Sequence, residues 1–156
     1  MRTLSTPHSV AVRTASIALG VFVSDAVSKA AAPALVSLHA GLGFVLPIQN
    51  AEYSFGIASA SLPLMLAASA LGILAFGGYT AWSATHGGLP AWIPGLLIGG
   101  GAGNLIDRLL FGAVHDWLDL GKVVVNLADL AILAGLAGYL VSVALHRRAE
   151  SRLERL

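Results

Sequence analysis

The chain contains no cysteine and little charge of either sign. Its 156 residues include 9 Lys or Arg and 8 Asp or Glu, so charged side chains make up 11% of the sequence, against about 25% in soluble domains. Without cysteine the chain has neither disulfides nor thiolate chemistry. So few charges cannot cover a water-facing surface, and a net charge of +1 excludes the basic footprint of a nucleic-acid-binding protein.

Hydrophobic residues make up 56% of the chain, and residues 53–106 form a run of 54 positions without Asp, Glu, Lys or Arg. A transmembrane helix needs about 20 apolar residues, so this run is long enough for two membrane spans. A glycine- and proline-containing break at 86–90 separates them. We therefore predict a single-domain, all-α integral membrane protein, whose four transmembrane helices cover residues 10–31, 62–82, 91–110 and 123–146.

Basic residues gather at the two ends of the chain, and this sets the predicted topology. Arg2 and Arg13 lie near the N-terminus, and four arginines lie in the segment 147–155. The positive-inside rule then places both termini in the cytoplasm and the two long loops, 33–61 and 111–122, on the outer face. The first span also has features of a cleavable signal peptide, but a charged pair precedes its small residues 30–32 and argues against cleavage.

Ionisable residues inside a membrane span are costly, so each is a candidate functional residue. Asp25 and Lys29 lie four positions apart on one face of the first span, which suits either a structural ion pair or a substrate site. Asn104, Asp107 and Arg108 share a face near the outer end of the third span. There Arg108 supplies a counter-charge to Asp107, which favours a structural or positioning role for this group.

The strongest candidate for chemistry is Asp129, which lies three residues after Asn126 near the outer end of the fourth span. Its sequence neighbours are apolar, and no basic residue lies within a helical turn of it. A hairpin leading from the outer loop into this span would bring Asp116 beside it. Two carboxylates in one site do not both ionise easily, so one keeps a proton while the other deprotonates a water molecule. We expect such a site to need no metal or cofactor, and His115 to be a solvated side chain.

Two glycine-rich segments have different predicted roles. Gly95 and the run at 99–103 lie in the third span, where small residues let helices pack closely. The stretch 41–56 mixes glycine with polar and apolar residues, which fits a small β segment over the site.

Four short blocks occur in order along the chain, at residues 25–29, 50–56, 101–117 and 126–129. The first block reads Asp-x-x-x-Lys and the second reads Asn-x-x-x-x-Phe-Gly. The third contains Gly-Asn-x-x-Asp-Arg followed by Gly-x-Val-x-Asp, and the fourth reads Asn-x-Ala-Asp. Together these blocks resemble the lipoprotein signal peptidases, the type II aspartyl peptidases of bacterial cytoplasmic (inner) membranes. The resemblance covers nearly the whole chain.

The resemblance implies a catalytic dyad of Asp116 and Asp129 on the outer face of the membrane. It also implies a set of polar residues that bind substrate or shape the site: Asp25, Lys29, Asn50, Asn104, Asp107, Arg108 and Asn126. The implied substrate is a prolipoprotein that carries a diacylglyceryl cysteine and is cut just before that cysteine. Membrane lipid and globomycin-type inhibitors are further implied partners, and we expect a monomer.

Three positions depart from the family pattern, and two other functions stay open. Glu52 and Ser54 stand where the family usually has Gly and Ala, and Val125 stands where Phe is usual. A diverged paralogue that binds lipoprotein precursors without cleaving them is therefore one alternative. The other is a small proton- or ion-coupled transporter subunit whose acids line the path. A proton path continues across the bilayer, whereas these acids gather towards the outer side, which favours the peptidase.

Overall fold

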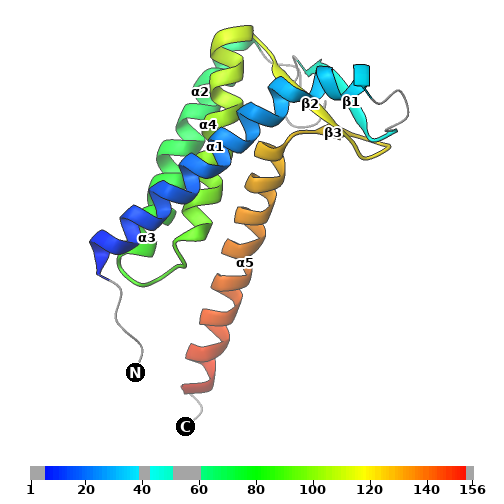
Figure 1. Ribbon diagram of the computed structural model, residues 1–156. Coiled ribbons are helices and arrows are strands. Elements are labelled where there is room, and N and C mark those ends of the chain that lie inside the picture. Colours follow the sequence, from blue (N-terminus) through cyan, green and yellow to red (C-terminus); the bar gives the residue numbers. More distant parts are fainter. Residues whose placement is uncertain (1–5, 39–42, 51–60, 154–156) are drawn as a thin grey trace.

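A computed structural model describes residues 6–38, 43–50 and 61–153, and shows a helical bundle with a small sheet at one end (Figure 1). The helices are α1 (Pro7–Leu38), α2 (Leu62–Gly72), the π-helical turn η1 (Ile73–Gly77), α3 (Gly78–Thr85), α4 (Trp92–Phe111) and α5 (Leu127–Leu153). The strands are β1 (Val45–Asn50), β2 (Val114–Asp119) and β3 (Val124–Val125). The predicted helical membrane fold with a small β segment is confirmed.

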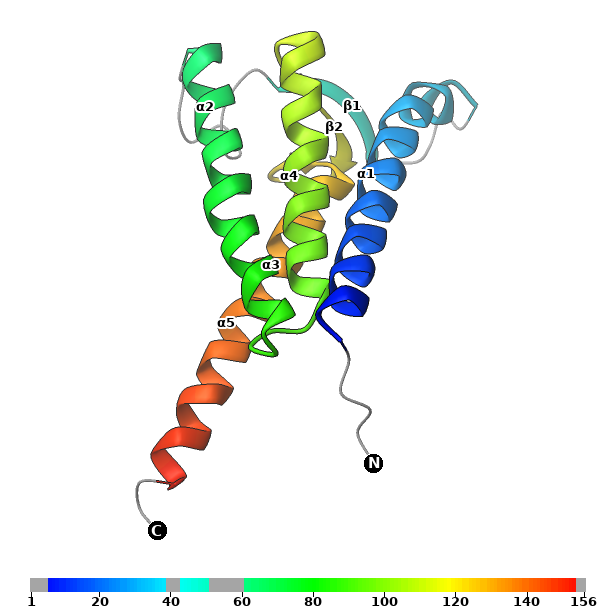
Figure 2. The ribbon, with the colours of Figure 1, turned by 90° about the vertical axis from the view of Figure 1, so that its left-hand side faces the viewer.

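Within the ranges that the structure describes, three helical segments are long and apolar enough to cross a membrane: Pro7–Val36, Leu62–Thr85 and Leu127–Ala149. The second of them is one continuous helix made of α2, η1 and α3. The third predicted span corresponds to α4, which is 20 residues long and carries the polar residues near its end. Figure 2 shows α4 between α1 and α2, and its main packing partners are α1 and α5. That α4 crosses the membrane stays a prediction.

The bounds of α1 and α5 differ most from the predicted spans. α1 continues through Pro33 to Leu38, because a proline removes one intrahelical hydrogen bond without ending a membrane helix. α5 begins at Leu127, and Val124 and Val125 pair with β2 instead of starting the helix. Asn126 caps α5: its Oδ1 accepts the Asp129 backbone N–H at 2.9 Å, while Asp129 Oδ2 accepts the Asn126 backbone N–H at 3.4 Å. This reciprocal capping box fixes where the helix starts.

The sheet has the order β1-β2-β3 with both pairs antiparallel. Asp116 lies opposite Ile48 of β1, and Leu118 lies opposite Val125 of β3. The β2–β3 hairpin turns at Gly121, whose φ of 85° suits a residue without a side chain. β3 then runs directly into α5, as the predicted hairpin requires. β1 confirms part of the predicted β segment at 41–56, whereas Glu52 and Ser54 lie outside the described residues.

Glycines of α4 allow the neighbouring helices to approach its backbone, as predicted. A Cβ atom on Gly99 would lie 2.5 Å from the carbonyl oxygen of Ala18 in α1. A Cβ atom on Gly100 would lie 2.5 Å from the carbonyl oxygen of Ala128 in α5. Both contacts are with backbone atoms, which cannot rotate away as a side-chain end can. The start of α5 is therefore seated directly on α4.

We expect Gly100→Ala to destabilise the bundle, because the added methyl group forces α5 away from α4. Overpacking of this kind costs about 1–3 kcal/mol of the free energy of unfolding. The measurement is the thermal unfolding midpoint of the purified protein in detergent. Gly72→Ala is the matched control, because a Cβ atom at Gly72 meets nothing within 4 Å. Equal midpoints for the two variants would contradict the expected contact.

Candidate active site

Asp129 lies in the first turn of α5, where two asparagines hold its carboxylate. Asn126 fixes the backbone around it through the capping box, and Asn104 of α4 donates its side-chain N–H to Asp129 Oδ1 at 2.8 Å. The hydrogen bond from Asn104 joins α4 to α5. The orientation of this carboxylate therefore depends on the packing of two helices.

Asp116 lies on β2 with only 3% of its surface exposed. Both of its carboxylate oxygens accept hydrogen bonds, from Asn126 Nδ2 to Oδ1 at 2.6 Å and from Asn50 Nδ2 to Oδ2 at 3.0 Å. Burial raises the pKa of Asp116, and the hydrogen bonds from Asn50 and Asn126 and the charges of Lys29 and Arg108 offset part of that increase. Asp116 thus keeps its proton to a higher pH than an exposed aspartate does.

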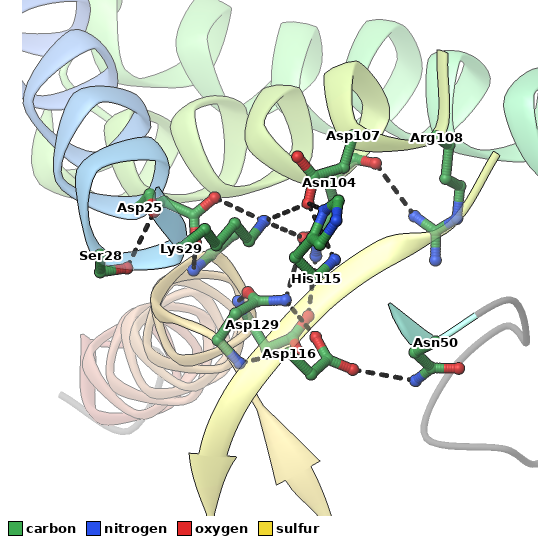
Figure 3. Close-up of polar contacts among 12 residues, drawn as sticks. Asp25, Ser28, Lys29, Asn50, Asn104, Asp107, Arg108, His115, Asp116 and Asp129 are labelled. Carbon is green, nitrogen blue, oxygen red and sulfur yellow. Dashed lines mark hydrogen bonds and ion pairs between the residues drawn. The ribbon is translucent and has the colours of Figure 1, made fainter. Parts of the chain in front are cut away.

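The two carboxylates meet at one place, although they lie 13 positions apart in sequence. Asn126 touches both, because its side-chain N–H₂ donates to Asp116 Oδ1 and its backbone N–H donates to Asp129 Oδ2. Figure 3 shows Asp116 and Asp129 side by side, and their charges interact directly. Such a coupled pair favours the state in which one carboxyl is protonated and the other ionised. The geometry thus suits general acid–base chemistry, and its catalytic role stays a prediction.

Both carboxylates line a cavity of about 370 Å³ that is polar at one end and apolar over most of its walls. Asn50, Asn104 and Arg108 complete the polar end. The apolar walls come from α2, η1, α4 and α5: Ala68, Ile73, Phe76, Leu97, Ile132, Leu133 and Leu136. A ligand that fills the cavity would place a polar group at the dyad and an apolar body between the helices.

Lys29 lies at the centre of a buried charged group beside the dyad. Its Nζ atom is 2.7 Å from Asp25 Oδ2 and 3.0 Å from Asp107 Oδ2. The sequence left two interpretations of Asp25 and Lys29 open, a structural ion pair or a substrate site. The structure shows the ion pair. Asp107, for which we predicted Arg108 as the counter-charge, also has Lys29 as a cation at 3.0 Å. Lys29 reaches this position because α1 packs against α4 along its length.

Arg108 donates from Nη1 to the backbone oxygen of Asn104 at 3.4 Å and lines the cavity. His115 is 32% exposed, and its ring lies 3.5 Å from Asp107. Its backbone N–H donates to Asp107 Oδ2 at 3.0 Å. In the ranges that the structure describes, no group of three or more His, Asp or Glu residues is arranged to hold a metal ion.

Sequence reasoning missed two kinds of site residue. Ser28 accepts a hydrogen bond from Trp117 Nε1 at 3.2 Å and donates to the Asp25 backbone oxygen at 2.8 Å, which ties β2 to α1. Ser28 and Trp117 lie within the sequence blocks at 25–29 and 101–117, and their place in these blocks is the signal that could have identified them. The apolar wall residues, such as Ile73 and Phe76, belong to a run in which no pattern separates cavity-facing from lipid-facing side chains.

The signal peptidase (SPase) II family matches residues 17–145, which is most of this chain. The chain belongs to the signal peptidase II family. The matched range includes every site residue predicted from the sequence, from Asp25 in α1 to Asp129 in α5. The resemblance read from the four blocks is therefore confirmed, and the family does not support the transporter alternative.

Relatives of this signal peptidase II family member include the lipoprotein signal peptidase of Syntrophomonas wolfei subsp. wolfei, with 38% identity over 117 residues. That alignment covers 74% of this chain and 78% of the relative. The lipoprotein signal peptidase of Aquifex aeolicus is 34% identical over 136 residues, with 78% of this chain and 80% of the relative covered. A solved bacterial membrane enzyme shares the fold, with a TM-score of 0.63 and 22% identity over 88% of this chain and 90% of that one. The chain is thus a multi-pass membrane protein of a peptidase family.

Proposed function

We propose that this protein removes the signal peptide from prolipoproteins that carry a diacylglyceryl cysteine, cutting the peptide bond just before that cysteine. The observation that carries the proposal is the pair of carboxylates, buried Asp116 and half-buried Asp129, at the polar end of an otherwise apolar cavity. Apolar walls suit both the lipid and the hydrophobic part of a signal peptide. The family to which the chain belongs supports the same activity.

In the proposed reaction one carboxylate of the dyad is ionised and the other is protonated. The ionised carboxylate takes a proton from water, and the water oxygen attacks the scissile carbonyl carbon. The protonated partner then donates its proton to the amine that leaves as the C–N bond breaks. Asn104 donates to Asp129 and Asn126 donates to Asp116, and these hydrogen bonds hold the two carboxylates in place. Arg108 lies at the polar end of the cavity, where it is placed to face the substrate backbone.

The proposed orientation puts the active site at the outer face of a bacterial cytoplasmic membrane. The start of α1 and the end of α5 lie at the same end of the bundle, opposite the sheet (Figure 1). Arg13 lies near the start of α1, and Arg147 and Arg148 lie in the last part of α5. These cations support a cytoplasmic location for both termini. The sheet and the dyad then face outward.

The test of the proposed function is cleavage of a diacylglyceryl-modified prolipoprotein by the purified protein in detergent. We expect one cut, located by mass spectrometry just before the modified cysteine. The same precursor without the lipid is the control and should stay uncut. A well-folded protein that binds the modified precursor but leaves it intact would instead support the diverged paralogue. Cleavage at unrelated positions in both precursors would contradict the proposed substrate class.

The proposal extends to inhibitors and to assembly. We expect globomycin to block cleavage in competition with the precursor. We also propose a monomer as the working form, because the dyad and its partners all come from one chain. The mass of the active species in detergent checks this assignment.

The pH dependence of cleavage should respond to Asn50, because its hydrogen bond to Asp116 lowers the pKa of that carboxyl. Asn50→Leu removes the bond, so the pKa of Asp116 rises further and the limb of the pH–rate profile that Asp116 controls moves to higher pH. The matched control is Gln49→Leu, which changes the neighbouring exposed residue of β1. If this limb stays in place or moves to lower pH in Asn50→Leu, the titration of Asp116 does not control it.

A further inference from the structure

Lys29 uses all three of its N–H donors, although its side chain is only 6% exposed. Nζ contacts Asp25 Oδ2 at 2.7 Å, Asp107 Oδ2 at 3.0 Å and Asn104 Oδ1 at 3.2 Å (Figure 3). Asp25 lies on the same helix as Lys29, whereas the other two acceptors lie on α4. A simple ion pair needs one of these contacts, so the other two require an explanation.

The first acceptor connects Lys29 to the helix that carries Asp129. Asp25 Oδ2 pairs with Lys29, and its other oxygen, Oδ1, accepts the backbone N–H of Ala128 at 2.9 Å. Ala128 is the second residue of α5 and directly precedes Asp129. Asp25 is 1% exposed, so this bond is shielded from water. The carboxylate that Lys29 fixes therefore holds the first turn of α5 in place.

The second acceptor connects Lys29 to the strand that carries Asp116. Asp107 Oδ2 accepts the backbone N–H of His115 at 3.0 Å as well as the ammonium group. His115 directly precedes Asp116 on β2. The position of β2 along α4 therefore depends on the same cation.

The third acceptor fixes the orientation of an amide group. Lys29 has no acceptor of its own, so the atom of Asn104 that faces it must be the amide oxygen. The amide N–H₂ of Asn104 then points the other way, where it donates to Asp129 Oδ1 at 2.8 Å. Asn126 Nδ2 donates to the same oxygen at 3.2 Å, so Lys29 and Asn126 together keep the amide in this orientation.

We propose that Lys29 is the positioning residue of the dyad, because its single ammonium group sets Asp116 and Asp129 relative to each other through Asp25, Asp107 and Asn104. This inference rests on the proposed function. Lys29 touches neither dyad carboxylate in these contacts and does not line the cavity in which both of them lie. Its effect should therefore fall on the rate of the chemical step and not on the binding of the precursor.

The experiment compares Lys29→Met with the wild type at saturating and limiting concentrations of diacylglyceryl-modified precursor. We expect kcat to fall by roughly 100-fold, as a misplaced reacting group does, while KM stays close to the wild-type value. The limb of the pH–rate profile that Asp116 controls should move to higher pH, because the charge of Lys29 lowers the pKa of Asp116. Lys122→Met is the matched control: it removes the same charge from an exposed position in the hairpin and should leave kcat unchanged.

A second variant keeps the test decisive if Lys29→Met does not fold. Lys29→Arg keeps a positive charge between Asp25 and Asp107, but a planar guanidinium cannot place one nitrogen within reach of all three acceptors. We expect a folded protein with a reduced kcat and an unshifted pH limb. Wild-type kcat in either variant, or a loss confined to KM, would overturn the positioning role. Absence of cleavage by the wild type is a different result, because it rejects the proposed function itself.

Discussion

Asp129→Asn and, separately, Asp116→Asn are expected to abolish cleavage of the lipid-modified precursor, with kcat falling by about 10³- to 10⁴-fold. An amide has nearly the same shape as a carboxyl group, but it neither accepts a proton from water nor donates one to a leaving amine. The measurement is the initial rate of release of the signal peptide. The double variant should be about as inactive as either single variant, because the two groups act as one unit.

Asp119→Asn is the matched control for both changes. Asp119 lies three residues after Asp116, outside the cavity, and its Oδ1 accepts the backbone N–H of Gly121 at 2.7 Å. An asparagine oxygen can accept the same bond, so the hairpin and the activity should be retained. Dyad variants that keep a rate within about tenfold of the wild type would fall short of what general acid–base catalysis supplies and would exclude the dyad. The thermal unfolding midpoint of each variant shows whether a loss of activity reflects a loss of fold.

The sequence predicts the parts of the site that lie close together along the chain. The Asp25–Lys29 pair follows from helical spacing, and the hairpin from Asp116 to Asn126 follows from the order of loop and helix. The start of α5 was also readable, because Asn126 and Asp129 have the spacing of a capping box. Assigning residues 123–125 to the fourth span overlooked this signal.

Contacts between distant helices were not predictable in the same way. Lys29 reaches Asp107 across 78 positions of sequence, and this contact depends on the rotation of α1 against α4. The hydropathy of either helix does not specify that rotation. The π-helical turn η1, which brings Ile73 and Phe76 to the cavity, lies inside an apolar run that predicts only a membrane helix. Apolar side chains suit lipid and cavity equally, so composition does not separate the two faces.

The second large effect is expected at Asn126, which is fully buried and contacts both carboxylates. Asn126→Ala removes the donor that lies 2.6 Å from Asp116 Oδ1 and the oxygen that caps the backbone N–H of Asp129. Loss of the cap should lower the free energy of unfolding by about 1–2 kcal/mol. Loss of the side-chain hydrogen bond frees the Asp116 carboxylate to move away from Asp129, which should reduce kcat by roughly 100-fold.

Asn126→Ser separates these two effects. A serine hydroxyl also caps a helix well, so the unfolding midpoint should stay near that of the wild type. The shorter side chain cannot reach both Asp116 and the start of α5, so kcat should fall nearly as far as in Asn126→Ala. Parallel measurements of unfolding and of cleavage rate decide between the two roles. Recovery of activity together with stability in Asn126→Ser would mean that Asn126 serves the dyad only by capping α5, and that Asp116 is held by Asn50 and its burial alone.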